Sequence, residues 1–176
     1  MITTLFSQVI WIGFILFQTL VQKERIVSVT SIVATVAMLA LSTNLRFDIA
    51  LFFICALIGF SIERILIRGG EQHFSQASLF GMPVWLPLVW GMGVVAMVRL
   101  GDTIVPMFPI FGLLVFTGIG FLYGIVVEII LGYIGRTQHW KNTSFFGVPP
   151  WLPLAWAAGF GTIWTIVIFI RNLVGV

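Results

Sequence analysis

Residues 69–93 read GGEQHFSQASLFGMPVWLPLVWGMG, and residues 135–159 read GRTQHWKNTSFFGVPPWLPLAWAAG. At this constant offset of 66 residues, 13 of the 25 positions are identical. One residue of slippage upstream then aligns Gly59 with Gly124 and Glu63 with Glu128. The repeating unit is therefore a helix with a late Glu, a loop containing His, and a helix start rich in Pro and Trp.

The composition around this repeat is that of a membrane protein. Hydrophobic residues make up 60% of the 176 residues and charged residues only 9%, and the mean hydropathy is +1.13. A soluble domain carries roughly 25% charged residues, and a disordered chain needs low hydrophobicity and high charge. The single Cys55 excludes an intramolecular disulfide. Nine scattered basic residues form no patch for nucleic acid.

Charged residues divide the chain into six uncharged or nearly uncharged runs, and the first of them, residues 1–22, is long enough as a helix to cross a hydrocarbon core of ~30 Å. We therefore predict an all-α polytopic membrane protein with six transmembrane helices. The expected spans are residues 1–22, 26–45, 49–67, 85–98 with its flanks, 110–134 and 151–170. Arg46 and Asp48 are expected in a turn, and residues 101–109 in a loop because Pro106 and Pro109 resist incorporation into a helix.

An even number of helices places both termini on one side of the membrane. Six basic residues lie at or near the first, third and fifth connections: Lys23, Arg25, Arg64, Arg68, Arg136 and Lys141. The other side has Arg46, Arg99 and Arg171. The positive-inside rule then predicts cytoplasmic odd connections and both termini outside the cytoplasm. We expect the cytoplasmic membrane of a bacterium or archaeon.

The duplication also predicts the domain organisation. Each unit holds two helices, so both copies have the same orientation, and an approximate two-fold axis along the membrane normal should relate them. We expect one transmembrane domain over residues 1–176. Within it, residues 1–48 form the first two helices, residues 49–100 the first unit and residues 105–171 the second.

The shared motif has a structural and a functional interpretation. Gly81 and Gly147 permit tight turns, and the prolines that follow suit the start of a helix. The tryptophans either anchor the helices at the membrane interface or line a ligand cavity near the bundle axis. The candidate ligand-binding aromatic residues are Trp85, Trp90, Trp151 and Trp156.

Glu63 and Glu128 are candidate catalytic residues. Each lies one to two turns inside the end of its expected helix, a costly depth for a carboxylate, and such intramembrane groups are functional candidates by default. The alternative is that each serves as a hydrogen-bonding partner between helices.

His73 and His139, the two histidines of the chain, occupy equivalent repeat positions, which inheritance from one ancestral unit would also explain. Two Glu and two His could also ligate zinc or iron, but their spacing matches no established metal motif, and we predict no metal site. A haem held by both histidines is a further alternative, and the sequence identifies no cofactor.

Positive charge near the cytoplasmic rim forms a third candidate feature. Arg68, Arg136 and Lys141 lie beside the N-termini of the fourth and sixth helices. Helix N-termini favour anions, so this rim suits an anionic lipid headgroup or a diphosphate. The ordinary positive-inside pattern explains the same residues.

The second unit, with EIILGYIGRTQHW at residues 128–140 and FGVPPWLPLAW at residues 146–156, resembles the carotenoid hydratase-like membrane family. The first unit, with GFSIE at residues 59–63 and FGMPVWLPLVW at residues 80–90, is similar to an uncharacterised bacterial membrane family with a P-x-W-L-x-x-L-W helix. The hydratase resemblance implies addition of water to an isolated isoprenoid double bond. It would make Glu63 and Glu128 the acid and base, and His73 and His139 assisting catalytic residues. The tryptophans would stabilise a cation.

Three functions therefore stay open. The first is a binding or scaffold subunit that holds a lipid, isoprenoid or pigment, within a larger membrane complex or alone. The second is a hydratase-like membrane enzyme, and the third is a small transporter. The chain has no P-loop, G-x-S-x-G, Cys pair or H-E-x-x-H motif, so ATP-driven transport and hydrolase chemistry are not indicated.

Overall fold

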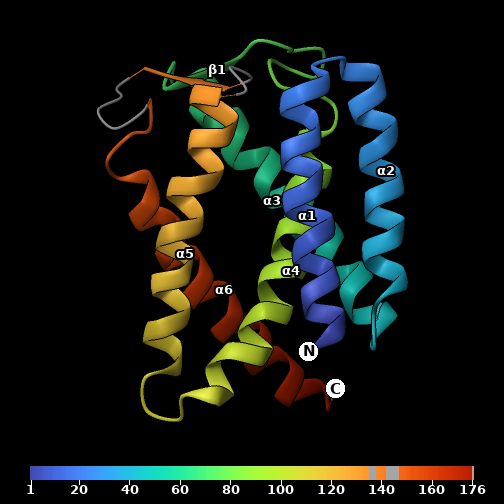
Figure 1. Cartoon of the computed structure of the whole chain (residues 1–176), viewed down its shortest axis with the longest axis vertical. Coiled ribbons are helices and arrows are strands. Elements are labelled where there is room, and N and C mark those ends of the chain that lie inside the picture. The colour runs from blue at the N-terminus through green and yellow to red at the C-terminus, as the bar shows by residue number, and fades with distance from the viewer. Residues whose placement is uncertain (135–137, 142–146, 176) are drawn as a thin grey trace.

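The computed structural model describes residues 1–134, 138–141 and 147–175 of the chain. Six α-helices run up and down alongside one another, with two short strands at one end of the bundle (Figure 1). Both chain termini lie at the opposite end from β1 (Figure 1). The elements are α1 (Ile2–Val21), α2 (Glu24–Ala40), α3 (Leu45–Arg68), β1 (Gln72–Phe74), α4 (Leu86–Met107), α5 (Gly112–Glu128), the π-helix η1 (Ile129–Ile134), β2 (Gln138–Trp140) and α6 (Leu152–Val174).

The all-helical architecture expected from the sequence is confirmed, with six helices in the described chain. Five segments are long and apolar enough to cross a membrane: α1, α3, α4, α5 with its continuation to Gly132, and α6. The segment α2 has 17 residues, about 26 Å at 1.5 Å per residue. It is shorter and more polar than expected, but its buried hydroxyls bond within the helix, as when Thr35 donates to the carbonyl of Ser31 at 2.8 Å.

The Pro- and Trp-rich motif starts two helices in the same way. Trp85 and Trp151 are the N-cap residues of α4 and α6, and Pro87 and Pro153 lie in the first turns, where a missing N–H costs little. Gly81 has φ 92° and Gly147 has φ 77°, a region that glycine enters without steric cost. The expected turns and helix starts are therefore confirmed.

The loop expected at residues 101–109 is wrong for its first seven residues, because α4 continues to Met107 with Pro106 inside it. Pro106 lies in the last turn, where its missing N–H removes one hydrogen bond and few turns remain for the ring to disturb. Asp48 is likewise not in a turn. It lies in the first turn of α3, after Asn44, whose Oδ1 accepts a hydrogen bond from the amide of Phe47.

Helix pairs pack closely within each repeat unit, α3 on α4 and α5 on α6, and α1 packs against α4. The core between them is aromatic and aliphatic. At its centre Trp11 stacks on Tyr123 with ring centroids 5.7 Å apart, and Trp156 packs on Trp11 at 6.1 Å. The first helix therefore contributes side chains to the centre of the bundle.

Candidate functional site

The Glu63 carboxylate is buried near the end of α3, with 6% of the residue exposed. Its Oε1 accepts a hydrogen bond from the Trp90 indole Nε1 at 2.9 Å, and its Oε2 accepts one from the Gln72 amide. Trp90 belongs to α4 and Gln72 to β1. Elements that follow Glu63 in the chain thus fold back to supply both of its donors.

The Glu128 carboxylate has a corresponding position at the end of α5, where the helix changes to the π-helix η1. It too is 6% exposed. Oε1 accepts from the Trp156 indole Nε1 at 3.2 Å, and Oε2 accepts from the Trp140 indole Nε1 at 3.3 Å. Both acidic residues therefore accept hydrogen bonds from neutral N–H groups at both oxygens.

Two glycines bring the tryptophans to the carboxylates. A Cβ on Gly59 would lie 2.2 Å from Cγ of Trp90, and a Cβ on Gly124 would lie 2.8 Å from Cγ of Trp156. Both distances are too short for any other residue without displacement of the indole. Gly59 and Gly124 are aligned in the duplicated sequence, and each lies one helical turn before its glutamate.

The two strands join the two acidic sites. β1 and β2 pair antiparallel, with Gln72 opposite Trp140, His73 opposite His139, and Phe74 opposite Gln138. This register is symmetric about the two histidines, whose rings stack with centroids 4.8 Å apart. Gln138 Nε2 donates to Gln72 Oε1 at 3.0 Å, which extends the hydrogen bonds of Glu63 across the strand pair.

Both glutamates line one cavity of about 310 Å³. Its walls come from α1, α3, α4, α5, η1, β2 and α6, and apart from the two carboxylates and Gln138 they are aliphatic, aromatic or glycine. Five tryptophans line it: Trp11, Trp90, Trp140, Trp151 and Trp156. A pocket of this size, largely apolar with a few polar groups, has the character of a small-molecule site.

The residues predicted from the sequence divide into two groups. Glu63, Glu128, Trp90, Trp151 and Trp156 all line the cavity. His73 and His139 are paired at the end of the bundle and are not among the lining residues. Trp85 is buried against Phe14, with ring centroids 6.2 Å apart, and does not line the cavity either.

Two of the three basic residues expected to bind an anion lie outside the cavity lining. Arg68 and Lys141 are exposed, and Arg136 lies outside the described residues. No group of three or more His, Cys, Asp or Glu side chains that could hold a metal ion occurs within the described parts of the chain.

Among the polar and tryptophan side chains of the lining, three were not predicted: Gln138, Trp140 and Trp11. Gln138 is identical to Gln72 in the repeat alignment, and Trp140 aligns with Phe74. Neither observation predicts that these side chains contact a helix, because that contact depends on the pairing of the two strands. Trp11 belongs to a helix outside the duplication. Long-range packing brings these side chains to the site, and such packing cannot be predicted from a local sequence pattern.

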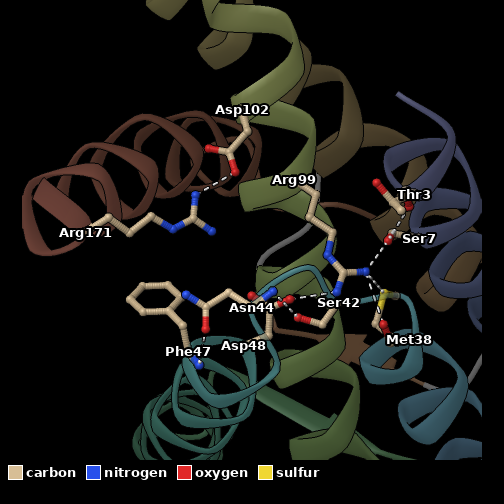
Figure 2. A network of polar contacts seen from close by, with 10 residues as sticks. All are labelled: Thr3, Ser7, Met38, Ser42, Asn44, Phe47, Asp48, Arg99, Asp102 and Arg171. Carbon is tan, nitrogen blue, oxygen red and sulfur yellow. Dashed lines mark hydrogen bonds and ion pairs between the residues drawn. The ribbon is translucent and has the colours of Figure 1, made fainter. Parts of the chain in front are cut away.

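A second polar cluster lies toward the other end of the bundle (Figure 2). Arg99, expected at the membrane edge, is instead buried in α4 and forms an ion pair with Asp48 at 2.7 Å. It also donates to Ser7 Oγ at 2.6 Å and to the Met38 carbonyl at 3.1 Å. Burial of the guanidinium is possible because three other helices supply these acceptors.

Comparison of the chain with protein-family models, curated proteins and solved structures finds no match. The fold and the hydropathy of its helices define a small helical membrane protein. Any more particular function rests on the geometry of the cavity.

Proposed function

We propose that this protein binds a membrane-soluble, largely apolar molecule of the lipid, isoprenoid or pigment class in the cavity between its two duplicated helix pairs. The observation that carries the proposal is the pocket of about 310 Å³ with its aromatic and aliphatic walls. Pockets of this size that are lined mainly by hydrophobic and aromatic side chains, with a few polar groups, are typical of small-molecule sites.

The duplicated units support the same proposal. Each supplies one glutamate and at least one tryptophan to the lining, and the paired strands hold the two units together at one end. We propose that the two units are related halves of a single binding site, with the approximate two-fold axis passing between the two histidines.

A glycine in the cavity wall provides the test. A Cβ on Gly159 of α6 would meet no atom within 4 Å, so Gly159→Leu places a side chain in the cavity without a backbone clash. Gly118 of α5 is equally unobstructed and is not a lining residue. Gly118→Leu is therefore the matched control, because both substitutions have a similar effect on helix propensity.

The experiment compares the molecules that co-purify with each variant in mild detergent, by solvent extraction and mass spectrometry. We expect a specific apolar molecule with the original protein and with Gly118→Leu, and at least a tenfold lower occupancy with Gly159→Leu. Equal occupancy in all three proteins would refute the proposed binding site.

A second candidate function is acid–base chemistry on an isolated double bond, favoured by the presence of both Glu63 and Glu128 in one cavity. One carboxyl group would protonate the alkene, water would add to the resulting cation, and the water's surplus proton would pass to the other carboxylate. Turnover that persists in both Glu63→Gln and Glu128→Gln would exclude this reaction.

A further inference from the structure

The acidic side chains of α3, α4 and α5 fall into two classes. Asp48 pairs with Arg99 at 2.7 Å, and Asp102 pairs with Arg171 at 2.6 Å. Glu63 and Glu128 have no salt-bridge partner in the described part of the chain. The protein therefore provides an internal comparison, in which two carboxylates carry their own cation and two do not.

The donors to Glu63 and Glu128 are neutral, so they satisfy hydrogen bonds without compensating charge. Each carboxylate oxygen has two lone pairs and accepts one hydrogen bond from a tryptophan or glutamine. Each oxygen thus retains acceptor capacity within the cavity. Among the described residues that line the cavity, none is Lys or Arg. Ionisation of a buried carboxyl group without a counter-charge is costly, and a cation placed between the two groups would favour their ionised form.

The walls of the cavity are also suited to positive charge. Tryptophan has the aromatic face that attracts cations most strongly, and cages of aromatic side chains recognise quaternary ammonium groups. Five tryptophans line this cavity together with the two carboxylates. An uncharged apolar ligand would be served equally well by leucine or phenylalanine walls.

An independent polar atom lies in the same lining. Trp11 is 3% exposed, and its indole Nε1 has no hydrogen-bond partner among the described residues. A buried polar group without a partner is costly, and Trp11 lines the cavity. An acceptor on the ligand apart from its cationic group would satisfy this indole.

We propose that the cavity selects a lipophilic organic cation, a molecule with an amine or quaternary ammonium group on an apolar body. This inference rests on the proposed binding function and specifies its ligand class. The positive group lies between Glu63 and Glu128 and against the indole faces, and the apolar body fills the rest of the cavity. The ligand supplies the counter-charge that arginines supply to Asp48 and Asp102.

The test uses two lipophilic ions of the same shape and opposite charge, tetraphenylphosphonium and tetraphenylborate. Their binding to the detergent-purified protein is measured by equilibrium dialysis. We expect saturable binding of the phosphonium ion and no saturable binding of the borate. Glu63→Gln and Glu128→Gln should each lower the affinity for the phosphonium ion by about tenfold or more, because glutamine keeps the shape but removes the charge.

Asp102→Asn is the matched control, since it removes a carboxylate that lies outside the cavity lining. It should leave phosphonium binding unchanged. Size-exclusion elution of each variant establishes that it is folded, and a Glu→Gln variant that fails this check is replaced by Glu→Met at the same position.

The outcomes separate the two proposals. Absence of phosphonium binding, affinity unchanged in both Glu→Gln variants, or equal borate binding would overturn the cation inference. The binding function would stand in each case if Gly159→Leu still lost the co-purifying molecule. Retention of that molecule in Gly159→Leu would refute the binding function itself.

Discussion

At the scale of single residues, the site depends on indole N–H groups that hold carboxylates in an apolar wall. Trp156→Phe removes the donor to Glu128 Oε1 while keeping an aromatic ring against Gly124. An acceptor left without its donor costs about 1–2 kcal/mol. We expect the apparent unfolding temperature in detergent to fall by about 2–8 °C, as measured by differential scanning fluorimetry.

Trp151→Phe is the control for this substitution. Trp151 also lines the cavity, but its indole N–H makes no hydrogen bond within the described residues. An equal loss of stability in the two variants would show that ring size, and not the bond to Glu128, is responsible.

The two glutamates and most of the tryptophans could be predicted as site residues, because an acidic residue deep in an apolar helix and a repeated motif are both visible in sequence. The residues that donate hydrogen bonds to the glutamates could not all be predicted. Gln72 and Gln138 were visible as identities without a role, since hydrogen bonds across 66 residues depend on strand pairing. The two histidines are the opposite case: they were predicted as site residues because the repeat contains both, but they do not line the cavity.

At the scale of elements, Arg99 connects four helices. From α4 it reaches Asp48 of α3, Ser7 of α1 and the Met38 carbonyl of α2 (Figure 2). Asp48→Asn would leave the guanidinium buried without a counter-charge. Breaking a buried pair in this way costs about 3–5 kcal/mol, so we expect a large loss of stability in thermal unfolding in detergent.

Asp102→Asn should have a smaller effect, about 1 kcal/mol or less, because the Asp102–Arg171 pair is more exposed to its surroundings. The double variant Asp48→Asn with Arg99→Met should recover part of the stability that Asp48→Asn loses. A double variant less stable than Asp48→Asn alone would mean that the guanidinium contacts to α1 and α2 outweigh the ion pair.

The helices themselves could be predicted from charge spacing and from the Pro and Trp motif, because both act within one element. The extension of α4 through Pro106 and the burial of Arg99 could not. A proline in a last turn and an arginine with acceptors on three other helices are stable only in the assembled bundle. From their positions in the sequence alone, Arg99 and Pro106 are predicted to lie at the edge of the membrane.

At the scale of the whole molecule, the paired strands close one end of the bundle and bring together residues 66 positions apart (Figure 1). Directly opposed residues of antiparallel strands have Cα atoms about 4.5–5.5 Å apart, within the roughly 4.4–6.8 Å that a disulfide spans. We expect His73→Cys with His139→Cys to form an intramolecular disulfide under mild oxidation, detected by intact mass and by peptide mapping.

A Cys55→Ala background removes the natural thiol. The pair His73→Cys with Lys141→Cys is the control, because these positions are out of register by two residues. Equal cross-linking of both pairs would contradict the strand register, and with it the symmetric placement of the two units.

The bond between Gln72 and Gln138 gives the two halves different chemical identities. An amide pair joined in this way has a direction, since one side chain donates and the other accepts. Glu63 consequently receives an amide N–H, whereas Glu128 receives a second indole. The two units are alike in sequence, but these different donors make their acidic sites chemically unlike. A guest molecule would meet two unlike ends, enter in one preferred orientation, and occupy the chain at a ratio of one to one.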